Sequence, residues 1–429
     1  MTDEDRITYF ARTNFRSDRR IFGIKRADRR AHMYVIGKTG TGESTLLETM
    51  IRQDIENGEG VAVIDPHGDP VEKVFGAIPE GRKTDVIYLN APDPAQPYGF
   101  NPVGNCPADK RPLAASGLIE VFKKIWFDAW GPRMEYILRN AVLALLDRPD
   151  STLADMPRLF DAKSFRRAAL FYSRNDHVRH FWLMEYEKYP ARLKAEAIAP
   201  IQNKVGTFLA HPLLRRILTE PKTDLRMRSI MDEGKILLVN LSKGRIGEDG
   251  TALLGALIVS RIGLAGLSRA NTPEENRKDF YLYLDEFQTF TTLSLANMLS
   301  ELRKYQLNLI LAHPFLTQLQ PELRSAILGN VGTIISFRIG AEDAEILEME
   351  FAPDLRAVDF VNLPNYHVYL RLMIDRLVSR GFRWGDGEKE SLISFNGRQV
   401  DANEELWQRG GVRFPKFISL GKSEHFGGG

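Results

Sequence analysis

The stretch from residue 33 to residue 64 constrains the fold more than any other part of this chain. An apolar run (33–36, MYVI) leads into a Gly- and Thr-rich loop (37–44, GKTGTGES), and residues with helical spacing follow as far as Asn57. A second apolar run at 61–64 (VAVI) ends at Asp65-Pro66. Buried strands that alternate with helices are typical of a parallel sheet covered on both faces. We therefore expect an α/β fold.

Apolar runs that read as strands continue along the chain, but a long helical interval separates them into two groups. The later runs lie at 86–89, 235–241, 280–284, 307–311 and 333–337. Helical patterns at 250–267 and 293–305 separate the last four runs. From about residue 113 to 231 strand signals fade and helical patterns dominate, as at 134–147 and 195–209. The sequence thus predicts a central, mostly parallel sheet interrupted by an all-α insertion.

These patterns divide the chain into five segments. We expect a basic arm at 1–30, the first part of the α/β domain at 31–112, the all-α domain at 113–231, the second part at 232–375 and an extension at 376–429. A hydrophobic content of 43% and a charged content of 27% are close to globular averages and exclude wholesale disorder. The single cysteine, Cys106, excludes a disulfide scaffold and a zinc site built from cysteines.

The Gly-rich loop matches the phosphate-binding pattern G-x-x-x-x-G-K-[ST] at every fixed position except one. Backbone N–H groups in such a loop curl around phosphates, and the N-terminus of the following helix adds positive potential. Ser44 supplies the hydroxyl expected to bind Mg²⁺. The missing element is the lysine, because position 43 is Glu43. Lys38, earlier in the loop, is not expected to replace it.

Glu43 reverses the sign of a charge that a nucleotide site needs. At about 4 Å and an effective dielectric constant near 20, one charge pair is worth about 4 kcal/mol. We therefore expect this chain to bind and hydrolyse ATP poorly. The glutamate is either an engineered knockout or a natural departure.

A pair of carboxylates follows the apolar run at 280–284 (FYLYL). Asp285 and Glu286 stand where a strand ends. In a nucleotidase this arrangement lets the first acid hold the water shell of Mg²⁺ and the second polarise the attacking water. The loop and the acid pair, in this order, predict a P-loop NTPase fold. The alternative is an ordinary strand end.

Local basic segments stand out against a net charge of only +2, which argues against a generally basic surface. Residues 1–30 hold nine Lys or Arg and five acidic residues, which indicates a solvated arm or a contact surface for a polyanion. Residues 164–216 hold ten Lys or Arg and four acidic residues, with aromatic residues between them. This block predicts DNA contacts, or a solvated helix surface over core aromatics. The candidate DNA-binding residues are Arg166, Arg167, Arg174 and Arg179.

No membrane span or signal peptide is expected. The longest apolar candidate, Thr251 to Leu267, is interrupted by Arg261 and is too short to cross a bilayer. The N-terminus lacks an apolar core behind a basic start.

Several motifs together resemble a known family. YVIGKTGTGEST, VAVIDPHGD, YGFNP, KILLVNLSKG and YLYLDEFQTF are similar to segments of the type IV secretion coupling-protein ATPases (TraD/TraG type), within the HerA/FtsK branch of RecA-like motors. The similarity covers roughly residues 20–375. It implies a homo-hexameric, ATP-driven translocase for DNA, single-stranded or bound to a relaxase, that acts in conjugation or secretion.

The resemblance also implies roles for individual residues. Asp285 and Ser44 hold Mg²⁺, and Glu286 is the catalytic base. Arg324 and Arg338 are candidates for the arginine that reaches the nucleotide of a neighbouring subunit; the alternative is a surface or helix-capping cation. The residues implied to surround the ATP phosphates are Gly37, Thr39, Gly40, Thr41, Gly42, Glu43, Ser44 and Thr45.

The sequence departs from the family beyond Glu43. The family usually has a sensor glutamine at the end of the strand before the arginine, whereas this chain has His313-Pro314. This departure puts the sensor role in doubt, and His313 and Gln318 are the candidates for it. The family's N-terminal membrane helices are absent from this sequence. We therefore expect a cytoplasmic protein, held at the inner face of the bacterial membrane by a channel or docking partner. His67 is interpreted as a structural turn near the nucleotide.

Two other functions remain open. The first is a catalytically silent ring or docking subunit, which Glu43 and Pro314 favour and the intact acid pair opposes. The second is a HerA-like motor for DNA processing.

Overall fold

The central element of the fold is a nine-stranded sheet. The computed structural model describes residues 3–12, 21–104, 106–220 and 223–375, and short strands at 377–378, 382–383, 393–395 and 398–400. The strand order is β15-β12-β11-β3-β10-β9-β4-β8-β5. The strands from β11 to β5 run parallel to one another. β12 pairs antiparallel with β11, and β15 pairs antiparallel with β12. The parallel strands are β3 (Met33–Ile36), β4 (Gly60–Asp65), β5 (Val86–Asn90), β8 (Ile236–Asn240), β9 (Phe280–Leu284), β10 (Leu307–His313) and β11 (Thr333–Ser336). The antiparallel pair is β12 (Tyr369–Arg371) and β15 (Phe382–Arg383). All seven predicted strands occur, and the predicted α/β class is confirmed.

The two halves of the sheet are interleaved. β4 precedes the helical segment in sequence, yet it pairs with β8 on one side and with β9 on the other; Val61 lies opposite both Ile236 and Tyr281. Strands from both parts of the chain therefore form one sheet, as the split pattern predicted. This strand order decides which loops meet at the carboxyl edge.

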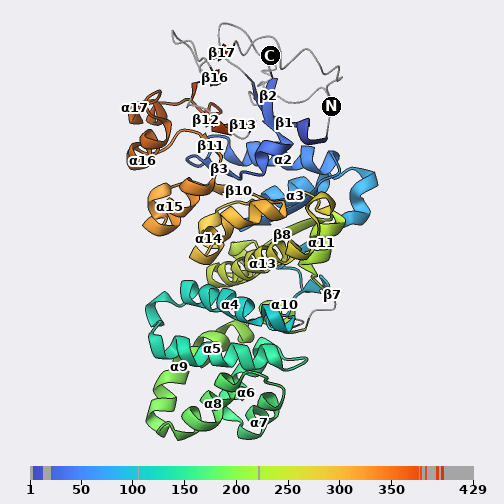
Figure 1. Cartoon of the computed structure of the whole chain (residues 1–429), viewed down its shortest axis with the longest axis vertical. Coiled ribbons are helices and arrows are strands. Elements are labelled where there is room, and N and C mark those ends of the chain that lie inside the picture. The colour runs from blue at the N-terminus through green and yellow to red at the C-terminus, as the bar shows by residue number, and fades with distance from the viewer. Residues whose placement is uncertain are drawn as a thin grey trace, which may run out of the picture.

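Each face of the sheet is covered by its own set of helices (Figure 1). On one face α2 (Glu43–Glu56) and α3 (Asp69–Gly76) pack with a hairpin of β1 (Ile7–Arg12) and β2 (Ile21–Lys25). On the other face lie α13 (Glu248–Ser268) and α14 (Leu293–Leu302). Side chains of β9 divide between these cores, because successive strand residues point to opposite faces. Tyr283 joins the first core and Leu282 the second.

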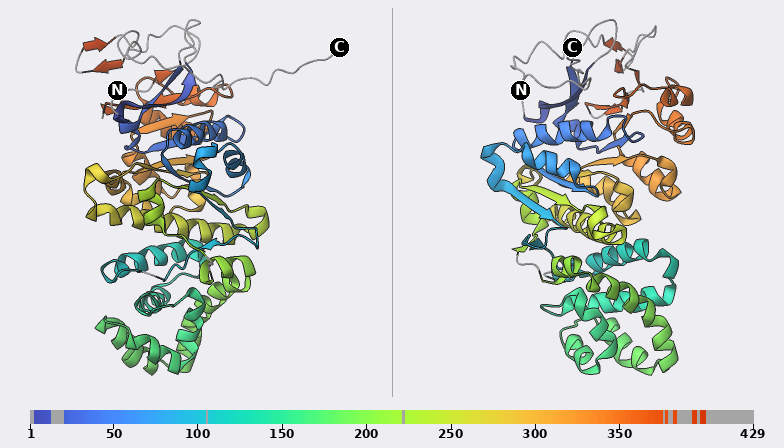
Figure 2. Two further views of the ribbon diagram at one scale, coloured as in Figure 1. Left: turned by 90° about the vertical axis from the view of Figure 1, so that its right-hand side faces the viewer. Right: turned by 180° about the vertical axis from the view of Figure 1, so that it is seen from behind.

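A helical block extends from the α13 face of the sheet. Figures 1 and 2 show it at the end of the molecule opposite the N-terminal hairpin, with α13 between the block and the sheet. α13 packs against α4, and α4 against α5. The block consists of α4 (Arg111–Ile125), α5 (Pro132–Asp147), α6 (Met156–Asp161), α7 (Lys163–Phe171), α8 (Asp176–His180), α9 (Ala191–Ala210) and α10 (Pro212–Thr219). α11 (Met227–Glu233) then leads back to β8.

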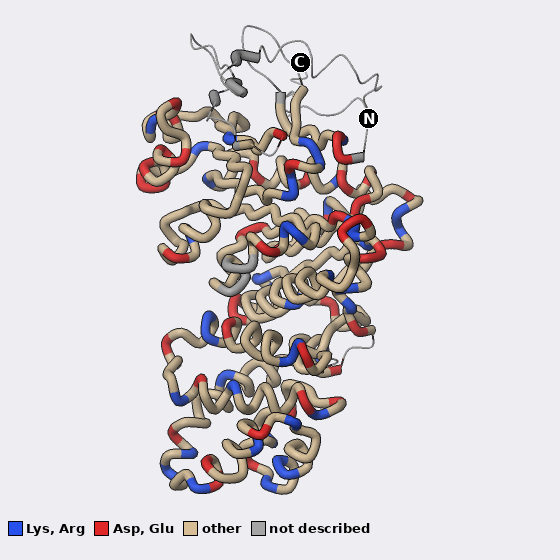
Figure 3. The backbone as a smooth tube through the Cα atoms, in the orientation of Figure 1, with Lys and Arg blue, Asp and Glu red and all other residues tan. Residues whose placement is uncertain are grey.

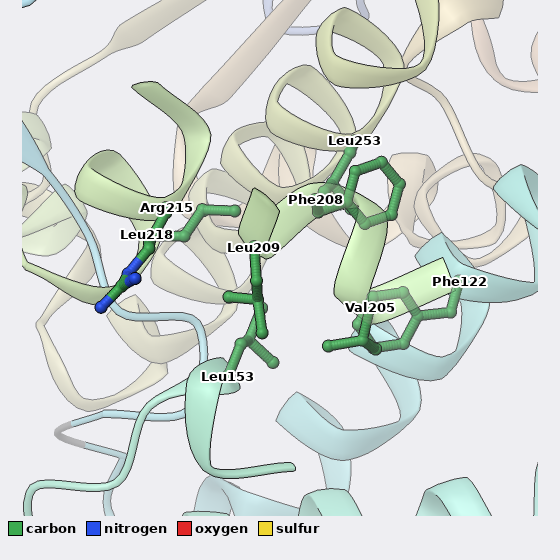
Figure 4. A pocket seen from close by; sticks show the side chains of 8 residues that line it. All are labelled: Phe122, Leu153, Val205, Phe208, Leu209, Arg215, Leu218 and Leu253. Carbon is green, nitrogen blue, oxygen red and sulfur yellow. The ribbon is translucent and has the colours of Figure 1, made fainter. Parts of the chain in front are cut away.

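A small cavity lies where this block meets α13. It is lined by seven apolar side chains and Arg215, and Figure 4 shows Phe208, Leu218 and Leu253 among them. Its volume is about 10 Å³, which is no more than the room a single water needs. The cavity is therefore a packing gap rather than a ligand site.

α13 is longer than its apolar core suggested. Within the described residues, one helical stretch, 248–271, is long and apolar enough to cross a membrane, and 72% of its apolar window is buried inside the protein. The prediction that this segment is too short was wrong, because the helix begins before Thr251 and continues past Leu267. It packs against α4, α11 and α14.

The described part of the N-terminal segment is not a free basic arm. Arg29 is 1% exposed and donates two hydrogen bonds to Asp54 on α2, at 2.6 and 2.8 Å, and a third to the Tyr283 hydroxyl at 2.8 Å. Arg30 pairs with Asp279 at 2.9 Å. These arginines neutralise internal acids, so the expectation of a solvated arm or polyanion surface is wrong for them. Residues 13–20 lie outside the described residues.

Candidate nucleotide site

The predicted site residues gather at the carboxyl edge of the parallel strands. β3, β10, β9, β4 and β8 are neighbours in this order, so the loops that follow them lie side by side. Ligands in open α/β sheets bind at this edge. Five neighbouring strands each contribute to this edge. In sheet order, the contributions are the loop 37–45 after β3, His313 of β10, Asp285 and Glu286 after β9, Asp65 and His67 at β4, and Lys243 after β8.

The phosphate loop has the backbone turns that its glycines predict. Gly40 and Gly42 have φ values of 81° and 122°, in the region that side chains avoid. Within the loop, the Thr41 N–H and hydroxyl both donate to the Lys38 carbonyl, at 3.1 and 2.6 Å. The Lys38 N–H donates to the Arg338 carbonyl at 2.9 Å, which ties the loop to the end of β11. The first N–H groups of α2 have no partner within the helix, so they can bind an anion.

Glu43 lies inside this edge rather than in solvent. Its Oε1 is buried without a hydrogen-bond partner, and its carboxyl group accepts a hydrogen bond from the His313 backbone. Burial, and then the negative charge of Asp285, raise the pKa of Glu43 well above its ordinary value. These surroundings act against the ionised carboxylate, so they weaken the charge reversal argued from the sequence. The positive charge that a lysine would supply at position 43 is still missing.

Two further carboxylates interact at this edge, because Asp285 acts on Glu43 and Asp65 acts on Asp285. Burial, and then the charge of Asp65, raise the pKa of Asp285 to about 6. Asp65 is fully buried, and its carboxylate accepts hydrogen bonds from the backbone of His67 at 2.7 Å and of Val71 at 3.2 Å. Burial also raises the pKa of Asp65. The site thus holds more negative charge than its own basic residues neutralise.

Two residues at this edge, Ser44 and Asp285, offer oxygen atoms, although the described residues contain no group of three or more His, Cys, Asp or Glu that could hold a metal ion. The Ser44 hydroxyl is exposed in the first turn of α2, and the carboxylate of Asp285 follows β9. Mg²⁺ prefers such oxygen ligands. A divalent cation would also relieve the charge that raises the pKa of Asp285.

Glu286 is held in place by two basic side chains. Its backbone is left-handed, with φ 45°. Its Oε1 lies 2.7 Å from His67 Nε2, and its Oε2 accepts a hydrogen bond from Lys243 Nζ at 3.4 Å. Burial acts to raise the pKa of Glu286, but His67 and Lys243 outweigh it, and the net pKa is lowered. The site therefore favours an ionised carboxylate.

His67 and Lys243 are the site residues that sequence reasoning missed. His67 was interpreted as a structural turn, yet its ring contacts the candidate base. Both residues stand directly after predicted strands, in DPHGD and NLSKG. Their position at strand ends indicated that they could lie at the carboxyl edge of the sheet. The sequence did not reveal the order of the strands, which decides which of these residues contact one another.

His313 is fully buried at the end of β10, where the sensor glutamine was expected. Within the described structure neither ring nitrogen has a hydrogen-bond partner. Its ring packs on Phe287 with centroids 5.1 Å apart. Burial lowers the pKa of His313 to about 4, so the ring is neutral. Gln318, the other candidate, is exposed in a short turn after β10.

The two candidate arginines lie on different elements. Arg338 lies two residues after the end of β11, and its carbonyl accepts a hydrogen bond from the Lys38 N–H of the phosphate loop. Arg324 lies on α15 (Pro321–Asn330). Both are half-buried, and within the described residues neither side chain forms a hydrogen bond or ion pair.

The predicted DNA-binding set needs one correction. Arg166 is 6% exposed; it donates to the Leu159 and Phe160 carbonyls at 2.8 and 3.0 Å and to Glu187 at 2.8 Å. Arg166 therefore holds the helical block together and does not face a ligand. The other three candidates, Arg167, Arg174 and Arg179, are exposed on or beside α7 and α8. Figure 3 shows basic and acidic positions mixed at this end of the molecule.

The fold and the order of its motifs define a class. A mostly parallel sheet with a phosphate loop after β3 and an acid pair after β9 is the fold of the RecA-like P-loop ATPases. No protein-family model and no curated protein matches the sequence.

Solved structures with a similar fold include a conjugative coupling protein and VirB4. The bacterial conjugative coupling protein TrwBdeltaN70 aligns at 17% identity and a TM-score of 0.57, over 85% of this chain and 87% of the TrwBdeltaN70 chain. TrwB in complex with ADP and Mg²⁺ aligns at 18% identity, over 85% of this chain and 88% of TrwB, with a TM-score of 0.58. VirB4 of Thermoanaerobacter pseudethanolicus aligns at 14% identity and a TM-score of 0.59, over 89% of this chain and 97% of VirB4.

Proposed function

We propose that this chain is a motor ATPase of conjugative transfer or type IV secretion that moves DNA or nucleoprotein, and that Glu43 weakens it in this form. The observation that carries the proposal is the convergence of the phosphate loop, Asp285 and Glu286 at one sheet edge. The contact between His67 and Glu286 adds a group that orients the base. TrwB, which shares the fold, binds ADP with Mg²⁺ and a non-hydrolysable ATP analogue, which supports ATP and Mg²⁺ as cofactors.

Each part of the site has a task in this reaction. The loop 37–45 and the N-terminus of α2 bind the phosphates. Ser44 and Asp285 would hold Mg²⁺, and the ion would supply positive charge to offset that of the phosphates. Glu286, ionised and held by His67 and Lys243, accepts a proton from the attacking water.

The proposal extends to assembly and cargo. A homo-hexamer would let Arg338 or Arg324, which have no partner in the described chain, reach the nucleotide of a neighbouring subunit. Arg167, Arg174 and Arg179 offer exposed cations to DNA phosphates. A membrane channel or docking protein would hold the cytoplasmic ring at the inner face of the membrane.

Glu43 favours a second candidate, a catalytically silent ring or docking subunit. Its carboxyl group occupies the place of the phosphate-binding lysine and has no cation to offer. Such a subunit would keep the fold and bind DNA or partners without turnover.

The deciding experiment compares the chain as it stands with Glu43→Lys. We expect Glu43→Lys to hydrolyse ATP in a Mg²⁺-dependent and DNA-stimulated manner, at least about tenfold faster than the parent, because one charged contact to a phosphate is worth about 1.5–3 kcal/mol. Glu43→Gln is the matched control, since it removes the carboxylate without adding a cation. Glu286→Gln in the Glu43→Lys chain should abolish turnover while leaving nucleotide bound.

The same measurements separate the alternatives. Equal and robust hydrolysis by the parent and Glu43→Lys would refute the proposed weakening. DNA binding without hydrolysis in both chains would support the silent subunit.

A further inference from the structure

The phosphate loop has two sides. On one side of β3 lie β10 and β9, with Glu43, His313 and the acid pair; on the other side lie β11 and β12. The loop after β11 (337–340) and the loop before β12 (364–368) flank this second side. The site described so far uses only the first.

Tyr366 is attached to the phosphate loop on that second side. Its N–H donates to the Thr41 carbonyl at 2.8 Å. Its ring packs on Gly42 so closely that a Cβ there would lie 2.9 Å from Tyr366 Cδ1 and 3.0 Å from Phe337 Cε1. The loop and the ring are therefore fitted to one another.

The conformation of Tyr366 is unfavourable for a bulky residue. Its φ is 63°, in the left-handed region, which costs conformational energy for a residue other than glycine. The residue is nevertheless 50% exposed, so burial does not account for its position. The hydrogen bond to Thr41 and the contact with Gly42 hold an aromatic face open beside the phosphate loop.

The direction of a bound nucleotide follows from the acid pair. Glu286 activates the water that attacks the terminal phosphate, so this phosphate faces β9. The rest of the molecule must leave the loop on the opposite side, toward β11 and β12. The exposed ring of Tyr366 lies on that side, in contact with the loop that holds the phosphates.

We propose that Tyr366 forms the base subsite, with the nucleobase stacked on the exposed face of its ring. This inference rests on the proposed nucleotide-binding function and adds the residue that recognises the nucleoside end. Stacking accepts any base, because every base has an aromatic face. Affinity for the base thus comes from Tyr366, whereas the loop and α2 bind the phosphates.

The test compares a ligand with a base and one without. Binding of Mg-ADP and of inorganic tripolyphosphate is measured by calorimetry on the Glu43→Lys chain, with and without Tyr366→Leu. We expect Tyr366→Leu to weaken Mg-ADP binding about tenfold, the scale of one lost base–aromatic stack, and to leave tripolyphosphate binding within about twofold. Tyr366→Phe keeps the ring and should keep most of the Mg-ADP affinity.

Three outcomes would overturn the inference or its basis. An equal loss of ADP and tripolyphosphate affinity would mean that Tyr366 acts by holding the loop. Unchanged ADP affinity in Tyr366→Leu would place the base elsewhere. If the Glu43→Lys chain with Tyr366 intact binds neither ligand, the proposed function itself fails.

Discussion

His67 Nε2 lies 2.7 Å from Glu286 Oε1, which joins the loop after β4 to the loop after β9. This contact explains why Glu286 keeps a lowered pKa although burial acts against its charge. It also fixes the direction of the carboxylate on a left-handed backbone. His67 is thus a positioning residue for the proposed base.

Removing the His67 ring should slow the chemical step more than binding. In the Glu43→Lys chain we expect His67→Ala to lower kcat for ATP about tenfold, a fraction of the 10²–10⁴-fold typical of a general base, with KM nearly unchanged. His67→Gln, which can still donate to Glu286, should recover part of the loss. Steady-state kinetics test this, and an unchanged kcat in His67→Ala would contradict it.

The buried Arg29–Asp54 pair should matter for stability. Arg29→Met leaves the Asp54 carboxylate buried with only the Tyr283 hydroxyl, at 2.5 Å, as a donor. Breaking a buried pair from one side costs about 3–5 kcal/mol in the free energy of unfolding, measurable by urea denaturation. The control is Arg52→Met, which breaks the partly exposed Arg52–Glu48 pair on the same helix and should cost less than about 1 kcal/mol. Similar losses of unfolding free energy in Arg29→Met and Arg52→Met would mean that burial does not decide how much such a pair contributes to stability.

Lys124 predicts a pH dependence of stability. Its Nζ donates to the carbonyls of Gln288 and Thr291, the latter at 2.8 Å, in the segment after the acid pair. Burial lowers the pKa of Lys124 from 10.5 to about 7. Between these values the unfolded chain binds more protons than the folded chain, so this residue makes stability rise with pH across that window.

Lys124→Met removes this titration. From pH 7 to pH 9 the parent should gain about 2 kcal/mol in the free energy of unfolding relative to Lys124→Met. Urea denaturation at both pH values measures the difference. A parallel pH response of the two proteins would mean that Lys124 stays charged in the folded state, held by the two carbonyls.

The exposed arginines of the helical block should set the salt dependence of DNA binding. Replacing Arg167, Arg174 and Arg179 by Gln should weaken binding and lower the slope of log K against log salt by about 2, since each phosphate contact to single-stranded DNA contributes about 0.7. Lys73→Gln, an exposed lysine on α3, is a control that should leave the slope unchanged. An unchanged slope in the triple variant would place the DNA elsewhere. Arg166→Met, by contrast, should lower stability because its partners are internal.

Much of the fold could be predicted because its signals are local. The apolar runs of β3, β4 and β9, the Gly-rich loop and the acid pair are each contiguous in sequence. The rule that parallel strands share one carboxyl edge explains why Ser44 and Asp285 lie at the same edge of the sheet. The length of α13 was missed because its ends are polar and only its middle carries the apolar signal.

Contacts between distant segments could not be predicted in the same way. The contact of His67 with Glu286 depends on β4 lying next to β9, and no residue in either strand specifies that order. The burial of Arg166 depends on how α7 packs against the segment that carries Glu187. The fit of Tyr366 on Gly42 joins the two ends of the α/β domain.

The sequence by itself determined the elements, the phosphate loop and the identity of Glu43, because these follow from local patterning and local backbone chemistry. Only the tertiary structure decided the surroundings of that residue. Burial and a neighbouring aspartate raise the pKa of Glu43, and both arise when strands that are far apart in sequence become neighbours. A residue that reads as a negative charge in the sequence is therefore, in the folded protein, a carboxyl group whose surroundings act against its ionised form.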